Sequence, residues 1–327
     1  MSLDSINRQE LNQVGKKIGV LMDPIESIKV EKDTSLAMML AAQRRGWEIY
    51  YFKRQDLFML DGIPSASLQA ATLYDDKNHW VDLQEKQDVP LAQLDCILMR
   101  LDPPFDMDYV FATYFLQRAS DLGVLVLNNP AALRDINEKV FTAWFPECCP
   151  PTLITSDAER FRLFHQQHRD IIVKPLDGMG GASIFRLKPE DPNVSVVLET
   201  MTNFGNRQIM AQRYIPEITE GDKRILVVDG EPVSHALARI PAAGETRGNL
   251  AAGGRGVAVP LSDRDRQIAN TIGPVLAEKG VLFAGVDVIG DWVTEINVTS
   301  PTCARELDEQ CGLDIGAQFM DAIAERL

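Results

Sequence analysis

Three residues near the C-terminus have the types and spacing of ligands for a divalent metal ion. Glu295 and Asn297 are two residues apart in a strand-like run, so their side chains point to the same face. Asp287 lies in the preceding run: a hairpin loop of three residues would place it opposite Glu295, and a loop of two would turn it to the other face. Carboxylate and amide oxygens suit Mg²⁺, with phosphate oxygens and water in the remaining positions. An ordinary exposed hairpin face is the alternative.

A lysine beside a glycine-rich turn forms a second candidate site, one for phosphate groups. Lys174 ends a strand-like run, and Gly178, Gly180 and Gly181 follow it. Glycine lets backbone N–H groups approach phosphate oxygens closely, and the lysine supplies a point charge. A surface lysine beside a flexible hairpin tip is the alternative for this motif in isolation.

Two further segments could contact other parts of a nucleotide. Residues 212–216 (QRYIP) could be a strand running into a connector whose backbone pairs with an adenine edge, although a plain linker fits equally well. Residues 242–256 form a glycine-rich loop with Arg247 and Arg255, and a loop of that length is unusual unless it is a lid or disordered. A lid with arginines over a transferring phosphate would exclude the water that hydrolyses an acyl phosphate.

The elements that must hold these residues follow two patterns. Over the first part of the chain, strand-like runs at 17–22, 48–52, 96–99 and 124–127 alternate with helical spacing at 34–45 and 109–122. This rhythm predicts a parallel sheet with helices on its faces. After residue 139 the pattern changes to antiparallel hairpins, notably within 224–240 and 285–298. We therefore predict an α/β protein of two or three packed domains.

Bulk composition excludes several classes of partner. The chain has 327 residues, of which 45% are hydrophobic and 24% charged, and its formal net charge is −14. This excess of acid disfavours nucleic acid and acidic membranes as partners, because affinity for either depends on excess Lys and Arg. No apolar run approaches the roughly 20 residues of a spanning helix, and the N-terminal residues are polar. We expect a cytoplasmic protein.

Several familiar active-site patterns are absent. No G-x-G-x-x-G follows the first strand, which argues against a dinucleotide dehydrogenase, and the sequence lacks both a P-loop and a G-x-S-x-G elbow. The five cysteines include no C-x-x-C pair, so neither a disulfide framework nor a zinc site is indicated.

Taken together and in order, these segments resemble the ATP-grasp superfamily and, within it, the bacterial glutathione synthetase family. The resemblance covers nearly the whole chain, from about residue 17 to residue 327, and several long motifs in one order are far more specific than any one alone. The matching segments are residues 20–24 (VLMDP), 97–106 (ILMRLDPPFD), 133–146 (LRDINEKVFTAWFP), 173–185 (VKPLDGMGGASIF), 222–232 (DKRILVVDGEP), 238–256 and 294–302 (TEINVTSPT).

The resemblance implies both an activity and a fold. The family joins γ-glutamylcysteine to glycine through an acyl phosphate, with ATP going to ADP and phosphate. We expect an ATP-grasp fold, in which an N-terminal parallel-sheet domain precedes two α+β subdomains that grip ATP. The expected bounds are 1–16 for a polar extension, 17–138 for the substrate-binding domain, 139–218 for the central subdomain and 219–327 for the catalytic subdomain with its mobile loop 242–256.

The resemblance also assigns residues to parts of the site. For ATP these are Lys139, Lys174, Gly178, Gly180 and Gly181 at the phosphates, Gln212, Tyr214 and Ile215 at the adenine, and Asp222 near the ribose. The metal ligands are Asp287, Glu295 and Asn297, for Mg²⁺ or alternatively Mn²⁺. The catalytic arginines at the transferring phosphate are Arg224, Arg239 and Arg247. The peptide substrate would contact Asp23, Arg100, Ser300, Thr302 and Arg305.

Arg100 and Arg305 are candidates for a second reason. The donor carries free carboxylates, and a guanidinium group binds a carboxylate bidentately and does not lose its charge. Alternatively, each arginine pairs with a structural acid such as Asp102 or Glu306.

Two features depart from the family, and two other functions stay open. The polar extension has no known role, and Arg213 stands where the family commonly has a smaller polar residue. A D-alanine–D-alanine or glutamate-adding ligase would share the ATP site but differ in the peptide pocket. A non-catalytic nucleotide-binding regulatory module is disfavoured by the metal residues and the arginine-bearing loop. The family suggests a homotetramer, with small molecules as its other partners.

Overall fold

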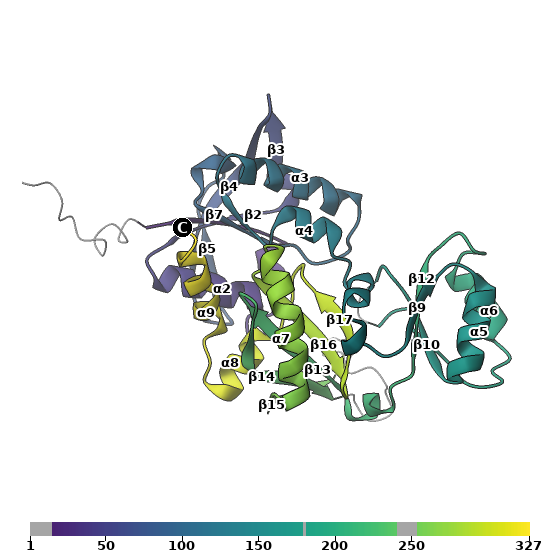
Figure 1. Ribbon diagram of the computed structural model, residues 1–327. Coiled ribbons are helices and arrows are strands. Elements are labelled where there is room, and N and C mark those ends of the chain that lie inside the picture. Colours follow the sequence, from purple (N-terminus) through teal and green to yellow (C-terminus); the bar gives the residue numbers. More distant parts are fainter. Residues whose placement is uncertain (1–14, 179–180, 241–253) are drawn as a thin grey trace, which may run out of the picture.

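The computed structural model describes residues 15–178, 181–240 and 254–327, which fold around three β-sheets (Figure 1). The first sheet combines parallel and antiparallel strands, and the other two are antiparallel. The predicted α/β class is thereby confirmed. The expected extension falls almost entirely outside these residues. Within them, no helix is both long and apolar enough to cross a bilayer.

The N-terminal sheet has a parallel centre. β1 (Lys17–Met22) lies between β2 (Glu48–Phe52) and β7 (Cys96–Arg100), and β8 (Leu125–Leu127) pairs with β7. The predicted strands are confirmed, because these short apolar runs are buried on both faces. The antiparallel side consists of β3 (Leu57–Leu60), β4 (Ile63–Leu73), β5 (Val81–Leu83) and β6 (Gln87–Pro90).

Two capped helices cover this sheet. The Asp33 carboxylate accepts from the Leu36 N–H at the start of α2 (Thr34–Arg44). Asp106 caps α3 (Met107–Asp121) in the same way, so this helix begins two residues before the predicted start. Both helices follow a strand of the parallel part, as the sequence rhythm predicts.

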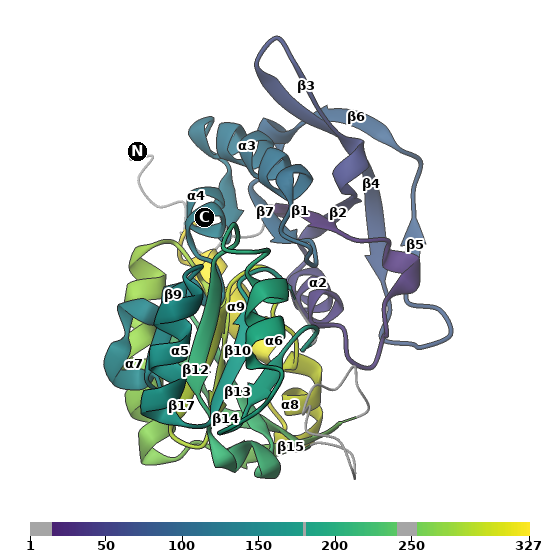
Figure 2. The same cartoon turned by 90° about the vertical axis from the view of Figure 1, so that its right-hand side faces the viewer.

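In the described part of the chain, helices cover one face of the middle sheet and leave the other face uncovered. Its order is β11 (Phe185–Leu187), β10 (Ile171–Pro175), β12 (Ile209–Arg213), β9 (Thr152–Thr155), and α5 (Ala158–His168) and α6 (Val194–Met201) cover it (Figure 2). Phe161, Ile171 and Val173 belong to the core under these helices. Because side chains alternate along a strand, Lys174 and Gln212 point to the opposite face.

The C-terminal sheet lies beside that opposite face (Figures 1 and 2). Its order is β15 (Arg255–Pro260), β14 (Glu231–Ile240), β13 (Asp222–Val228), β16 (Phe283–Ile289), β17 (Trp292–Asn297). The other helices are α7 (Asp263–Glu278), α8 (Ala304–Cys311), α9 (Ile315–Ala324) and α4 (Pro130–Asp135), with short 3-10 helices at Ile25–Ser27, Arg54–Asp56, Leu91–Gln93, Val140–Trp144, Pro146–Cys148 and Pro216–Glu220.

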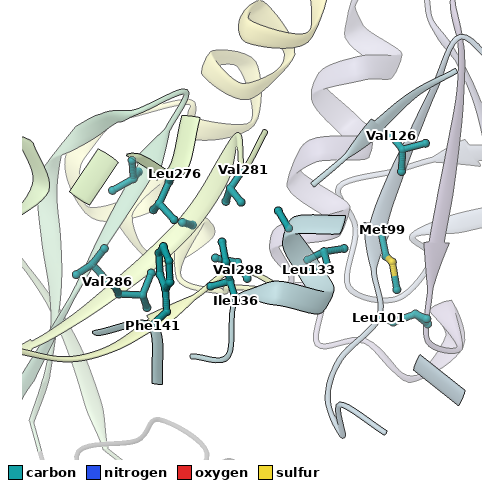
Figure 3. Close-up of a cluster of buried hydrophobic side chains, with 14 of the residues drawn as sticks. Met99, Leu101, Val126, Leu133, Ile136, Phe141, Leu276, Val281, Val286 and Val298 are labelled. Atoms are coloured by element: carbon teal, nitrogen blue, oxygen red, sulfur yellow. The ribbon is translucent and has the colours of Figure 1, made fainter. Parts of the chain in front are cut away.

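The N-terminal and C-terminal sheets share two cores. One runs from Met99 and Val126 through Leu133 and Phe141 to Leu276, as Figure 3 shows. The other joins α2 to α8 and α9, so the last helices of the chain pack on the first α-helix described. The middle sheet has a core of its own.

Candidate active site

The three candidate metal ligands come together on the β16–β17 hairpin. The turn has two residues, Gly290 and Asp291, because Ile289 pairs with Trp292. Asp287 nevertheless pairs with Glu295, since the register shifts by one residue at Thr294. Our expectation that a two-residue loop would separate these carboxylates is therefore wrong. A β-bulge inserts one residue into a strand and restores the common face.

Asp287 is the centre of a buried ion-pair network. Its carboxylate oxygens accept from Nε and Nη2 of Arg224, both at 2.8 Å, and Arg239 Nη2 lies 3.0 Å from Oδ2. The carboxylate is almost inaccessible, with 4% of the residue exposed. Burial alone would raise the pKa of Asp287, but Arg224 and Arg239 hold it below its usual range. The group therefore stays ionised although it is buried, and the site is not an ordinary exposed hairpin face.

Arg239 connects this network to a second carboxylate. Its Nε donates to Asp222 Oδ1 at 2.9 Å, and the two side chains form a bidentate pair. Arg224 also donates from Nη1 to Thr302 Oγ1 at 3.4 Å. Two of the three assigned arginines, the assigned ribose residue and one assigned substrate residue thus belong to one continuous chain of contacts.

Two buried lysines face this network from other segments. Lys174 is 4% exposed, and its Nζ donates to the Thr294 carbonyl at 3.0 Å. Lys139 is 2% exposed and lies 3.7 Å from Glu295 Oε1. Burial lowers the pKa of Lys174, and the charge of Glu295 offsets part of this effect. Two cations held this far from water are ready partners for polyanionic phosphate.

The backbone around Lys139 explains its position. The Ile296 N–H donates to the Glu138 carbonyl at 2.8 Å, which ties this segment to the outer edge of β17. Lys139 Nζ also donates to the Gly178 carbonyl at 2.9 Å. Gly178 has φ +128°, a conformation that favours glycine, so the expected phosphate turn lies against the first lysine.

The expected adenine residues lie where the middle sheet runs into its connector. Gln212 is buried and donates from Nε2 to Thr152 Oγ1 at 3.1 Å. The Tyr214 N–H already donates to the Asp170 carbonyl at 2.9 Å, so an adenine edge would use other backbone groups there. Ile215 is buried at the start of the following 3-10 helix.

Arg213 has a contact that the sequence left open. Its guanidinium lies 5.6 Å from the centroid of the Trp292 ring, and Arg264 lies 6.0 Å from the same ring. The arginine therefore links the middle sheet to the tip of the β16–β17 hairpin through a cation–π contact.

The donor set of the hairpin fits a hard divalent cation. Asp287 and Glu295 lie opposite each other on the two paired strands. Asn297 donates from Nδ2 to Asp287 Oδ2 at 3.3 Å. In the described part of the chain, no group of three or more His, Cys, Asp and Glu could hold a metal. The candidate set reaches three ligands only through the amide oxygen of Asn297, which suits Mg²⁺ better than a soft metal.

The expected substrate residues are divided between two environments. Asp23 is exposed, and Ser300 donates to the Arg100 carbonyl at 3.3 Å. Arg100 itself is buried and donates to Ser35 Oγ at 3.0 Å and to the Pro301 carbonyl at 2.9 Å. Arg305 pairs with Asp75 at 2.6 Å, neither of the two acids weighed from the sequence.

Two assigned residues, Gly180 and Arg247, lie outside the described residues, as does most of the loop 242–256. Sequence reasoning missed two backbone carbonyl groups that position the buried lysines. The Glu138 carbonyl positions Lys139, and the Thr294 carbonyl holds Lys174. Backbone groups leave no signal in residue type, so only the register could have revealed them.

Comparisons with known proteins give matches over nearly the whole chain. The family model for the N-terminal domain of prokaryotic glutathione synthetase matches residues 17–134, and the model for its ATP-grasp domain matches residues 138–312. A glutathione synthetase from Shewanella oneidensis is 57% identical over 311 residues, which cover 95% of this chain and 99% of that protein. One from Pseudomonas putida is 58% identical over 311 residues, with 95% and 98% coverage.

Solved structures with the same fold are more distant in sequence. D-cycloserine synthetase DcsG gives a TM-score of 0.66 at 17% identity and covers 94% of this chain and 99% of its own. The ATP-grasp ligase PsnB with its minimal precursor gives 0.62 at 18% identity, with 96% and 100% coverage. These likenesses concern the fold alone.

Proposed function

The chain belongs to the prokaryotic glutathione synthetase family, and from this premise we propose which of its side chains perform each part of the reaction. The enzyme is an ATP-dependent ligase that joins γ-glutamylcysteine to glycine and releases ADP and phosphate. Residues 17–138, 139–218 and 219–327 are its proposed substrate, central and catalytic parts.

ATP is proposed to bind between the middle and C-terminal sheets. The observation that carries this proposal is that two buried lysines from separate segments meet the hairpin of Asp287 and Glu295. Lys139 and Lys174 contact the phosphates, together with the turn of Gly178, Gly180 and Gly181. Gln212, Tyr214 and Ile215 hold the adenine, and Asp222 lies near the ribose.

Asp287, Glu295 and Asn297 are the proposed ligands of Mg²⁺, for which Mn²⁺ is the alternative. The bound ion would neutralise charge on the β- and γ-phosphates of ATP. Arg224 and Arg239 hold Asp287 in the structure, so phosphate would compete with this carboxylate for the arginines, and the metal ion would compete with the arginines for the carboxylate. Arriving phosphate gives the arginines new partners and leaves the carboxylate for the cation.

Arg224 and Arg239 then stabilise the phosphoryl group as it passes to the donor carboxylate, and Arg247 is proposed to assist. The charge in this transfer is spread over phosphoryl oxygens, so fixed guanidinium groups lower the barrier without a protein nucleophile. The glycine amine next attacks the acyl phosphate. Cys303 is fully buried, and burial raises the pKa of its thiol, consistent with a packing role.

Asp23, Ser300 and Thr302 are proposed to contact the peptide donor. Arg305 would join them by exchanging Asp75 for a substrate carboxylate. Arg100 is proposed to position the site without contacting the donor. Its guanidinium donates to the Pro301 carbonyl and so fixes the loop that carries Ser300 and Thr302. We further propose that the protein is cytoplasmic and that it is a homotetramer. Light scattering on the purified protein would test the tetramer.

ADP release with different substrate pairs tests the function. We expect ADP with γ-glutamylcysteine and glycine, and none above background with two D-alanines or with γ-glutamylcysteine alone. Faster release with two D-alanines would replace this assignment with the other ligase class.

A further inference from the structure

A pocket of about 240 Å³ lies at the carboxyl ends of three neighbouring strands of the N-terminal sheet. Asp23 follows β1, Lys53 follows β2, and Asp102 follows β7 after one intervening residue, and all three line the pocket. The chain passes from β1 through α2 to β2 on one side of β1, whereas β7 lies on the other. Parallel α/β sheets bind ligands at such a change of direction.

One wall of the pocket is acidic. The Asp102 N–H donates to Asp23 Oδ2 at 2.8 Å, which brings the two residues together at the opening. Both residues are exposed, so neither carboxylate is committed to the core. The Ser300 hydroxyl donates to the Arg100 carbonyl, two residues before Asp102, and this links the wall to the segment that follows the metal strand.

Two cationic side chains, Lys53 and Arg54, also line the pocket, together with the acidic Asp106. Arg54 lies 3.6 Å from Asp106 and 3.7 Å from Asp108, separations typical of loose surface pairs. Among the residues whose placement is described, Lys53 has no ion pair.

A buried hydroxyl group in the lining of this pocket points independently to a ligand. Tyr109, in the first turn of α3, lines the pocket and is 1% exposed. Its hydroxyl is one of two buried side-chain polar atoms in the described residues without a hydrogen-bond partner. Burial raises the pKa of Tyr109 further above its usual value, so the group stays a donor. Buried polar groups are rarely left unpaired, and a bound acceptor would satisfy this one.

We propose that this pocket binds the free amino-acid end of the γ-glutamyl donor. Asp23 and Asp102 hold its ammonium group, and Lys53 and the Tyr109 hydroxyl hold its α-carboxylate. The inference rests on the proposed function and names the specificity-determining residues of that donor. Ser300 lies three residues after Asn297, so a donor anchored here would direct its other carboxylate toward the metal strand.

Two donor analogues, each lacking one of the two charged groups, test the acidic and the basic side chains of the pocket separately. Glutaryl-cysteine keeps the α-carboxylate and lacks the ammonium, whereas 4-aminobutyryl-cysteine keeps the ammonium and lacks the carboxylate. Both retain the cysteinyl carboxylate that is phosphorylated. With glycine and ATP, we expect each to raise the donor KM of the wild-type enzyme by tenfold or more.

Variants should then respond selectively to the three donors. Asp102→Asn should raise KM about tenfold for γ-glutamylcysteine and 4-aminobutyryl-cysteine, but change KM for glutaryl-cysteine less than twofold. Lys53→Met and Tyr109→Phe should raise KM about tenfold for γ-glutamylcysteine and glutaryl-cysteine, but change KM for 4-aminobutyryl-cysteine less than twofold. The KM for ATP should stay constant throughout, and Lys29→Met, an exposed lysine outside the pocket, is the matched control.

The results separate two kinds of failure. Equal changes for all three donors, or unchanged donor KM in all three variants, would overturn the pocket assignment while leaving the ligase intact. Absence of ADP with γ-glutamylcysteine and glycine in the wild type would instead overturn the function on which it rests. Tyr109→Phe is the variant least exposed to a folding defect, because its hydroxyl forms no bond within the described chain.

Discussion

Glu295 and Asn297 can be changed without removing core packing, because both are only partly buried. We predict that Glu295→Gln and Asn297→Asp both lower kcat, since each alters an oxygen ligand beside Asp287. Added magnesium should partly restore the weaker variant. Rates measured over a magnesium titration would show this, with the exposed Glu278→Gln as control. Wild-type rates for both variants at ordinary magnesium would remove the metal assignment.

Asp308 gives a pH-dependent prediction at the same scale. Burial raises its pKa from 3.8 to about 6, although its Oδ1 accepts from the Ile315 N–H at 2.9 Å. The folded protein therefore binds this proton more tightly than the unfolded chain, and the contribution to stability is lost as pH rises from about 4 to 6.

Asp308→Asn should abolish this dependence and keep the hydrogen bond. We expect the variant to gain Tm relative to the wild type at pH 7 and to match it near pH 4. Thermal unfolding at both values measures the difference, and the exposed Asp121→Asn should show none of it. A constant offset at both pH values would contradict the mechanism.

Helix α7 packs directly against the β13–β14 turn, a contact at the scale of elements. A Cβ at Gly273 would lie 2.0 Å from the Gly230 carbonyl oxygen, and no side chain fits there. We predict that Gly273→Ala lowers the free energy of unfolding by about 3 kcal/mol through overpacking. Gly312→Ala is the control, because it meets no atom within 4 Å and has only its φ of +65° to strain it, for about 1 kcal/mol. Equal urea midpoints for the two variants would exclude the steric argument.

The β16–β17 hairpin shows what the sequence predicts and where it stops. Alternation placed Glu295 and Asn297 on one face, and the hairpin was predicted in the region where β16 and β17 pair. The bulge at Thr294 was invisible, because a single extra residue changes register without changing composition. Arg100 illustrates the same limit. Its type suited a substrate carboxylate, but only the packed structure gives its bonds to Ser35 and Pro301.

At the scale of the whole molecule, the middle sheet is the unit that stands apart. Its core around Phe161 is separate from the two cores that the other sheets share. We predict that Phe161→Ala lowers amide hydrogen-exchange protection in β9, β10 and β12 and leaves β1 and β13 unchanged, because locally cooperative units open independently. Phe319→Ala, in a shared core, should instead reduce protection in both β1 and β13. A uniform loss in both variants would show one cooperative unit.

The sharing of cores was not predictable from the sequence. The sequence predicts that each helix buries an apolar face, but it does not reveal which element packs against that face. Residues such as Leu36 and Phe319 are far apart in the chain, and only their common cluster shows that one covers the other.

The packing of α9 on α2 has a consequence for synthesis on the ribosome. Arg44 and Asp314, which bond across this contact, are 270 residues apart. At roughly 5 to 20 residues per second, the apolar face of α2 waits about 15 to 55 seconds for the segment that covers it. The packing of α2 is therefore completed last, and we expect nascent chains stopped before residue 315 to expose an apolar surface of the kind that chaperones bind.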